Sequence, residues 1–294
     1  MKALLDSGIG RHVLNFGRMI KFSHTVFALP FALSSVVLAH QRATVTFRTF
    51  FWIMIAMIGA RSAAMGFNRI ADIRFDRLNP RTADRAIPAG TVSLISAVGF
   101  VAGFSVVFIL AAAMISRLCF WLSFPVLLIL FFYSYTKRFT LLSHLYLGLS
   151  ISLSPLGAWI AVTGRFDASI LILCAALLTY IAGFDILYAC QDIQFDQNIG
   201  LYSIPARLGV KTAFHISSLL HMMTFGLLVA LCMVFHLGML YGFSLACIGA
   251  LLIFQHRVIR PHDLTHIELA FFHANSAISI LLFLGILGDT LLKG

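Results

Sequence analysis

Residues 168–190 read ASILILCAALLTYIAGFDILYAC, and this stretch decides the fold. It holds one charged side chain, Asp185, near its C-terminal end. A helix that crosses a bilayer needs about 20 mostly apolar residues. The stretch therefore predicts a transmembrane helix that carries a carboxylate in its apolar run.

The composition extends this interpretation to the whole chain. Of its 294 residues, 60% are hydrophobic and 11% are charged, and the mean hydropathy is +0.96. A soluble domain is about half apolar and about a quarter charged, so an ordinary cytosolic or disordered protein is excluded. The net charge of +10 does not indicate a nucleic-acid partner, because a basic patch needs soluble surface and this chain has little. No protein partner is indicated either.

Apolar runs separated by polar breaks predict an all-α, polytopic membrane protein with nine transmembrane helices. Small residues such as Gly59 and Ala60 favour close helix packing in lipid. We expect one integral-membrane domain over residues 1–294. The predicted helices cover residues 22–40, 50–70, 92–114, 118–135, 141–162, 168–190, 211–235, 238–256 and 268–291.

The basic residues predict which side of the membrane each loop faces. With a cytoplasmic N-terminus, fifteen of the 21 Lys and Arg residues fall in inside segments and five in outside segments, while Arg61 lies within a span. Cytoplasmic loops carry such an excess of Lys and Arg. We therefore expect a cytoplasmic N-terminus in a multi-pass protein of the bacterial cytoplasmic (inner) membrane.

Six of the 11 acidic residues gather around two inside loops, at about 68–90 and 185–210. The first loop contains Asp72-Ile73-Arg74-Phe75-Asp76, and the second contains Asp192-Ile193-Gln194-Phe195-Asp196. An Ile-Pro-Ala sequence follows in both, at 87–89 and 204–206. The match predicts two pseudo-repeated halves that meet at one site.

Each half places polar side chains on one helical face, because spacings of four, seven and eleven residues return to the same side of a helix. Capping explains a single acidic pair equally well, but two matching pairs beside hydrocarbon favour a binding site. Oxygen ligands are what Mg²⁺ takes, usually together with substrate phosphates. The two stripes consist of Asn68, Asp72 and Asp76, and of Asp185, Tyr188, Asp192 and Asp196.

Basic residues near both acidic stripes complete a site suited to a diphosphate, whose developing negative charge the cations neutralise. Any one of them, taken alone, is explained as an orientation signal. Arg61 differs, since an arginine inside a membrane span indicates a functional site. The flanking residues are Arg18, Lys21, Arg81, Arg85, Lys137, Arg138, Arg207 and Lys211.

At these residues the chain resembles the UbiA superfamily of intramembrane aromatic prenyltransferases. The first family signature is similar to Arg61-x6-Asn68-x3-Asp72-x3-Asp76, and the second to Asp185-x2-Tyr188-Ala189-x2-Asp192-x3-Asp196. Three shorter motifs match as well, and pattern alone supports the last three spans. The shorter motifs are Arg18-x2-Lys21, Tyr133-x3-Lys137-Arg138 and Ser154-Pro155.

The resemblance implies a nine-helix bundle around a central cavity, with two Mg²⁺ ions and a polyprenyl diphosphate at its acidic loops. Two positions depart from the family pattern: Arg69 stands where Asp is frequent, and Tyr202 where Lys is frequent, so Arg207 or Lys211 is expected to replace one diphosphate contact. The implied metal ligands are Asn68, Asp72, Asp76, Asp192 and Asp196, and the implied diphosphate ligands are Lys137, Arg81 and Arg207.

The expected reaction is ionisation of the allylic diphosphate followed by attack of an aromatic acid through a ring carbon. The stretch 79–90 resembles the 4-hydroxybenzoate polyprenyltransferase-like branch, which indicates ubiquinone biosynthesis. Prenylation of 1,4-dihydroxy-6-naphthoate in menaquinone synthesis by the futalosine route is the alternative, and an ion-coupled transporter is the rival from another class. The residues expected to shield the cation or hold the acceptor are Tyr133, Tyr188, Arg61 and Lys21.

Asp185 and the histidines are less well defined by pattern. Asp185 is expected either to assist acceptor binding and proton removal or to support the metal ligands. His262 and His266 are four residues apart but lie beside Pro261 and Asp263, which favours an interfacial loop over a metal pair. His144 and the remaining histidines have no partner that the sequence reveals.

Overall fold

The computed structural model describes residues 16, 17, 19, 25–258 and 273–293, and in these residues every regular element is a helix. Eight of the described helices are long and apolar enough to cross a membrane. This confirms an all-α polytopic architecture. Six of the eight helices match a predicted span to within three residues at both ends, whereas Ala168–Ile199 continues nine residues past the predicted end at 190 and Asn275–Lys293 begins seven residues after the predicted start at 268. The eight cover Phe47–Ala71, Leu94–Ile115, Arg117–Thr136, Ser143–Thr163, Ala168–Ile199, Val210–Val234, Met239–Val258 and Asn275–Lys293.

The first predicted span corresponds to α3 (Thr25–His40), which has 16 residues in the described part of the chain. It is apolar but shorter than the other eight. Residues 20–24, where the predicted span begins, lie outside the described residues. A ninth span and the orientation of the N-terminus therefore stay predictions.

The chain divides into two compact units, of which unit 1 comprises residues up to 25 together with 51–135. It contains α5 (Ile73–Leu78), α6 (Leu94–Ile115), α7 (Arg117–Thr136) and most of α4 (Phe47–Ala71). The backbones of α4 and α6 approach closely, since a Cβ atom on Gly59 would lie 2.8 Å from the backbone nitrogen of Phe108. This contact confirms the packing role expected for the small residues of this span.

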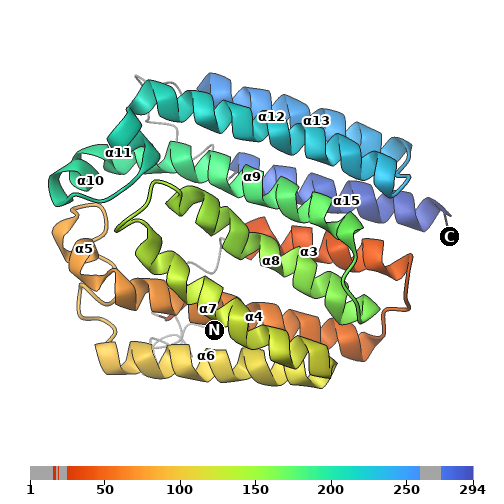
Figure 1. Cartoon of the computed structure of the whole chain (residues 1–294), viewed down its shortest axis with the longest axis horizontal. Helices are drawn as coiled ribbons and strands as arrows, with labels where there is room; N and C mark the ends of the chain where they lie inside the picture. The colour runs from red at the N-terminus through yellow and green to blue at the C-terminus, as the bar shows by residue number, and fades with distance from the viewer. Residues whose placement is uncertain (1–15, 18, 20–24, 259–272, 294) are drawn as a thin grey trace, which may run out of the picture. The chain divides into compact units, whose positions relative to one another are not determined.

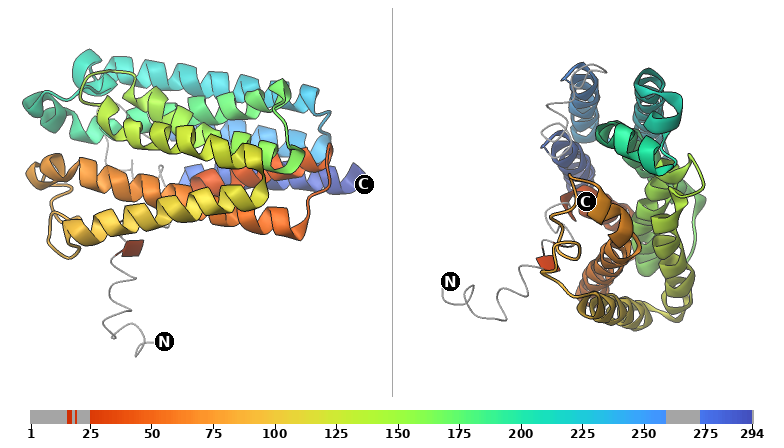
Figure 2. Two further views of the ribbon diagram at one scale, coloured as in Figure 1. Left: turned by 60° about the horizontal axis from the view of Figure 1, so that its bottom comes forward. Right: turned by 90° about the vertical axis from the view of Figure 1, so that its left-hand side faces the viewer.

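Unit 2 comprises residues 26–50 and 136–294. Its helices run alongside one another, with α9 lying against both α8 and α12 (Figure 1 and Figure 2). Apart from α3, its longer helices are α8 (Ser143–Thr163), α9 (Leu171–Ala189), α12 (Val210–Val234), α13 (Met239–Val258) and α15 (Asn275–Lys293).

A seam of buried polar side chains joins the helices of unit 2. Asn275 Oδ1 accepts hydrogen bonds from the Tyr180 hydroxyl (2.7 Å) and from Gln255 Nε2 (2.6 Å), which connects α15 with α9 and α13. His221 Nδ1 and His256 Nε2 lie 2.9 Å apart and connect α12 with α13. Such bonds hold helices together in lipid, where apolar surface provides no driving force between them.

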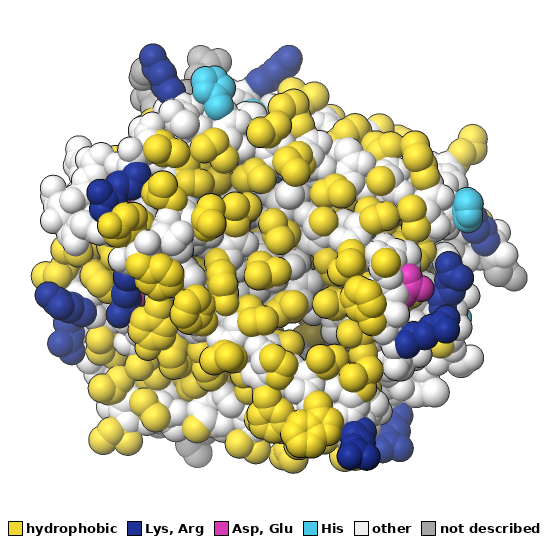
Figure 3. Space-filling model, viewed as in Figure 1, with side chains coloured by type: hydrophobic (Ala, Val, Ile, Leu, Met, Phe, Trp, Pro, Cys, Tyr) yellow, Lys and Arg dark blue, Asp and Glu magenta, His cyan; other side chains and the backbone are white. Residues whose placement is uncertain are grey.

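Hydrophobic side chains cover most of the face shown in Figure 3. Large apolar residues on the long helices are exposed, among them Leu128 (69%), Met222 (64%) and Phe243 (70%). An extensive apolar surface of this kind marks an interaction site or contact with lipid. Together with the helix lengths, it indicates an integral multi-pass membrane protein.

A buried acid fixes the start of α13. Asp289 on α15 is 4% exposed and accepts hydrogen bonds from the backbone N–H groups of Gly238, Leu240 (3.2 Å) and Tyr241 (3.2 Å). A helix N-terminus carries unpaired N–H groups and a partial positive charge, and a carboxylate satisfies both. Asp289 therefore joins the two helices, a role that its sequence position did not reveal.

We expect Asp289→Ala to lower the free energy of unfolding by about 2 kcal/mol, because it leaves buried N–H groups at the start of α13 without an acceptor. Thermal unfolding of the purified protein in detergent measures the change. The control is Leu291→Ala, at a side chain that is 71% exposed on the same helix. Equal melting temperatures for the two variants would contradict this role.

Candidate active site

The two acidic segments share an unusual local backbone. Asp72 lies between α4 and α5 with φ −93° and ψ 3°. Asp192 ends the short 3-10 helix η3 (Cys190–Asp192) and precedes α10 (Ile193–Ile199) with φ −105° and ψ 9°. Active-site residues are often found in this sparsely populated region of backbone space. Both helices are thus interrupted at an Asp, where the spacing argument assumed continuous helices.

In unit 1 the interruption leaves the first stripe intact. The Asp72 N–H donates to the Asn68 carbonyl at 3.0 Å, and the Asp76 N–H donates to the Asp72 carbonyl at 2.8 Å. Asn68 Nδ2 donates to Asp72 Oδ2 (3.3 Å) and to Ser134 Oγ on α7 (3.4 Å). Asp72 is 3% exposed. The predicted residues therefore lie together, beside the end of α7 that carries the half-buried Tyr133.

Asp76 has cationic partners that the sequence analysis did not assign to it. Arg85 Nη1 lies 2.7 Å from Asp76 Oδ1, and Arg69 Nη1 lies 3.6 Å from Asp76 Oδ2. Arg69 and Asp76 are both buried, and a buried charge needs such a partner. Arg69 is the residue that departs from the family pattern, and it stands two helical turns before Asp76 on the same side.

The other predicted residues of unit 1 lie nearby in the chain. Arg81 is half-buried, and its N–H donates to Asn79 Oδ1 at 3.0 Å. The Thr82 hydroxyl donates to the Asp76 carbonyl at 3.2 Å, which folds this loop back onto the acidic segment. Arg61 is half-buried on α4, two turns before Asn68. The predicted residues Arg18 and Lys21, and also His262 and His266, lie outside the described residues.

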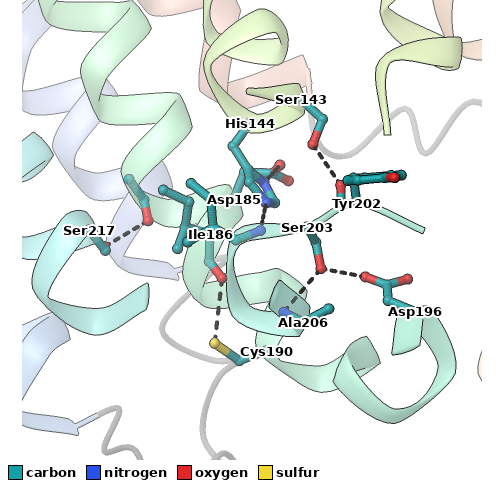
Figure 4. Close-up of polar contacts among 12 residues, drawn as sticks. Ser143, His144, Asp185, Ile186, Cys190, Asp196, Tyr202, Ser203, Ala206 and Ser217 are labelled. Atoms are coloured by element: carbon teal, nitrogen blue, oxygen red, sulfur yellow. Dashed lines mark hydrogen bonds and ion pairs between the residues drawn. The ribbon is translucent and has the colours of Figure 1, made fainter. Parts of the chain in front are cut away.

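In unit 2 a serine connects the second acidic segment to the loop that follows it (Figure 4). Ser203 Oγ donates to Asp196 Oδ2 at 2.7 Å. The same oxygen accepts from the Ala206 N–H and caps α11 (Ile204–Leu208). One side chain therefore fixes both the Asp196 carboxylate and the helix that carries Arg207.

Asp185 and His144 form a pair that the sequence did not predict. His144 is the second residue of α8, and its Nδ1 lies 2.7 Å from Asp185 Oδ2 (Figure 4). Its Nε2 accepts the Ile204 N–H at 3.3 Å. The two residues are 41 positions apart and share no motif, so no local pattern could have joined them.

The predicted cations of unit 2 are organised around Tyr202, the second position that departs from the family pattern. The Tyr202 N–H donates to the Lys137 carbonyl at 2.7 Å. The Arg207 guanidinium lies 4.2 Å from the centre of the Tyr202 ring, a cation–π contact. Lys211 is exposed in the first turn of α12, and Tyr188 is half-buried on α9 one turn after Asp185.

The donor set in each unit fits a hard cation. Carboxylate and amide oxygens are the ligands that Mg²⁺ prefers, and both units supply them next to Lys or Arg residues. Among the described residues, no three His, Cys, Asp or Glu side chains gather into a cluster that could hold a metal ion. The fit to Mg²⁺ therefore rests on the type of oxygen donor in each acidic segment and not on an assembled cluster of ligands.

These features define a class: a polytopic membrane protein with two matching acidic segments beside cationic groups, suited to a metal-bound anion. The sequence profile of the UbiA prenyltransferase family matches residues 28–277. The chain belongs to this family, as its signature residues predicted.

Three known proteins illustrate the similarity. A 4-hydroxybenzoate octaprenyltransferase from Nitrosospira multiformis is 32% identical over 79% of this chain and 80% of its own length. The apo structure of a UbiA homolog from Aeropyrum pernix K1 is 34% identical, covers 90% of this chain and 98% of its own, and has a TM-score of 0.83. A UbiA homolog from Archaeoglobus fulgidus bound to GPP and Mg²⁺ is 17% identical, covers 93% and 99%, and has a TM-score of 0.70, which shows the shared fold.

We expect Ser203→Ala to increase hydrogen exchange of the amides at 204–207 by roughly 5- to 30-fold, the effect of losing a cap worth about 1–2 kcal/mol. Exchange measured by mass spectrometry tests this. The control is Ser143→Ala, because Ser143 donates to the Tyr202 carbonyl over a longer distance of 3.4 Å. Unchanged exchange in Ser203→Ala would contradict the capping role.

Proposed function

We propose that this protein transfers a polyprenyl group from an allylic polyprenyl diphosphate to a ring carbon of an aromatic acid, 4-hydroxybenzoate, in ubiquinone biosynthesis. The observation that carries the proposal is the pair of matching acidic segments, each interrupted at an Asp and each beside Lys or Arg. Membership of the UbiA prenyltransferase family supports the reaction. The name of the relative from Nitrosospira multiformis supports the acceptor.

Positive side chains hold the diphosphate in this proposal. Tyr202 contacts the Lys137 backbone and the Arg207 guanidinium, and the other proposed ligands are Lys211 on α12 and Arg81 in unit 1. Related proteins of the same fold from Archaeoglobus fulgidus have been solved with GPP or DMAPP and Mg²⁺, which supports a prenyl diphosphate substrate. The long apolar tail suits a protein whose helices present apolar surface to lipid.

Mg²⁺ is the proposed cofactor, with two ions expected. When bound, the metal neutralises negative charge on the departing diphosphate. The proposed ligands are Asn68, Asp72, Asp76, Asp192 and Asp196.

The chemistry then follows from the side chains of this chain. The bond between the allylic carbon and the diphosphate oxygen breaks, and the electron pair leaves with the oxygen while Lys137 and Arg207 hold the anion. Tyr133 and Tyr188 shield the allylic cation through their ring faces. The ring carbon ortho to the phenol attacks, and loss of its proton restores aromaticity. Asp185 is the proposed proton acceptor.

The acceptor and the membrane complete the proposal. Arg61 or Lys21 pairs with the carboxylate of the aromatic acid. The chain forms one domain of nine spans in two pseudo-repeated halves, in the bacterial cytoplasmic membrane. Its N-terminus and the active site face the cytoplasm, which agrees with the fifteen inside and five outside basic residues.

We expect Asp72→Ala and Asp192→Ala each to reduce prenyl transfer by at least about 100-fold. Each substitution removes a proposed metal ligand, so the negative charge that develops on the departing diphosphate is less well neutralised. The assay uses membranes with labelled allylic diphosphate, 4-hydroxybenzoate and Mg²⁺, and it measures both the prenylated acid and released inorganic diphosphate. Full transfer in either variant would refute the two-metal assignment.

The matched control for these variants is Asp167→Ala. Asp167 is half-buried and lies outside the spans, and the hydrogen bond that it accepts from the Ser169 backbone N–H at 2.9 Å holds its pKa below the usual value. Removing this carboxylate should leave transfer unchanged. If the wild-type protein released no diphosphate with 4-hydroxybenzoate or with 1,4-dihydroxy-6-naphthoate, the result would favour the ion-coupled transporter over the transferase.

The acceptor is tested by competition between 4-hydroxybenzoate and 1,4-dihydroxy-6-naphthoate with a single prenyl donor. We expect 4-hydroxybenzoate to give most of the product, as the names of the relatives indicate. Mass spectrometry of the prenylated products gives the ratio. If the prenylated naphthoate were the main product, the protein would be assigned to menaquinone synthesis, and the proposed transferase mechanism would still hold.

A further inference from the structure

His144 is a buried histidine that nothing in the proposed chemistry uses. Its side chain is 5% exposed, whereas that of its partner Asp185 is 26% exposed. The imidazole contacts Asp185 through one nitrogen and the backbone of Ile204 through the other. It therefore lies between an acidic side chain of the active site and the loop that follows the second acidic segment.

The two contacts fix the tautomer of His144. A backbone N–H can only donate, so Nε2, which faces the Ile204 N–H at 3.3 Å, must be the unprotonated acceptor. The ring proton is then on Nδ1, which donates to Asp185 Oδ2 at 2.7 Å. His144 thus donates from Nδ1 to the Asp185 carboxyl oxygen and accepts at Nε2, an arrangement that orients functional imidazole and carboxyl groups elsewhere.

The contacts also restrict motion. The terminal torsion of an Asp side chain is broad, so an isolated carboxylate turns easily. The Nδ1–H bond removes this freedom at Asp185, whose side chain is 26% exposed. The bond from Ile204 ties the same imidazole to the residue next to Ser203, whose hydroxyl holds Asp196. One ring therefore links Asp185 to the loop that sets Asp196.

We propose that His144 is a positioning residue of the active site. It orients the Asp185 carboxylate and fixes the position of this carboxylate relative to the loop at 202–204. This inference rests on the proposed function, because it matters for rate only if Asp185 acts on the substrate. His144 does not touch the substrate in this assignment and is not itself a catalytic residue.

Two substitutions separate the two contacts. In His144→Asn the amide nitrogen occupies the place of Nδ1 and can still donate to Asp185, while the acceptor for the Ile204 N–H is lost. In His144→Gln the amide oxygen reaches the place of Nε2 and can still accept from Ile204, while the donor to Asp185 is lost. The pair therefore tests orientation of Asp185 separately from attachment of the loop.

We expect His144→Gln to lower kcat by about 10- to 100-fold, the usual effect of removing a group that orients a functional ligand. KM for the prenyl diphosphate should change by less than about threefold, because the donor to Asp185 does not contact the diphosphate. His144→Asn should keep kcat within about threefold of wild type, while hydrogen exchange of the amides at 202–206 rises.

A double-mutant cycle with Asp185→Asn supplies the second readout. If His144 acts through Asp185, adding His144→Gln to Asp185→Asn should reduce the remaining rate by less than about twofold. The control is His256→Gln, at another largely buried histidine of unit 2, which is bonded to His221 and Ser218 and touches no acidic residue in the described contacts. Its kcat should equal that of the wild type.

The outcomes are distinguishable. Equal kcat values for His144→Asn and His144→Gln would overturn the positioning role. So would a double variant whose loss of rate equals the product of the two single losses. In both cases transfer by the wild type would still support the proposed function. Absence of transfer in the wild type would overturn the proposed function and this assignment with it.

Discussion

A carboxylate buried among apolar helices loses its water, and each such ion costs several kcal/mol unless other groups compensate it. Four buried or half-buried acids among the described residues are each compensated in a different way. Asp76 has two guanidinium groups, Asp289 has three backbone N–H groups, Asp185 has an imidazole and Asp196 has a hydroxyl. Two of these contacts, those of Asp289 and Asp185, join helices that are more than 40 residues apart in the sequence. The need to compensate buried charge thus shapes both the fold and the site.

In unit 2 this need concentrates contacts on the short loop at 202–204. Tyr202 holds the Lys137 backbone and carries the Arg207 guanidinium over its ring. Ser203 holds Asp196, and Ile204 holds His144. A loop of three residues therefore contacts the Arg207 guanidinium, the Lys137 backbone and the Asp196 carboxylate, and reaches the Asp185 carboxylate through His144. The mechanism proposed for diphosphate release requires these groups to keep fixed distances, and rigid attachment of the loop provides this.

Away from the acids, the helices associate through small and polar residues. Lipid tails are as apolar as leucine, so burying a leucine between helices gains little in a membrane. Close approach at Gly59 in unit 1 and the seam of Tyr180, Gln255 and Asn275 in unit 2 supply packing and hydrogen bonds instead. The exposed Phe, Leu and Met side chains are then available to face lipid.

From the sequence alone, each of the eight long described helices was located as an apolar run, because a bilayer fixes the length of such a run and the hydropathy pattern shows it directly; the ninth span stays a prediction. The sequence also brought Asn68 and Asp72 together correctly, since a spacing of four residues defines a helical face. It could not show the breaks at Asp72 and Asp192, or that Arg69 and Arg85 hold Asp76 and His144 holds Asp185. Those features depend on which segments meet after folding, and a histidine or arginine carries no sign in its local sequence of the carboxylate that it will find.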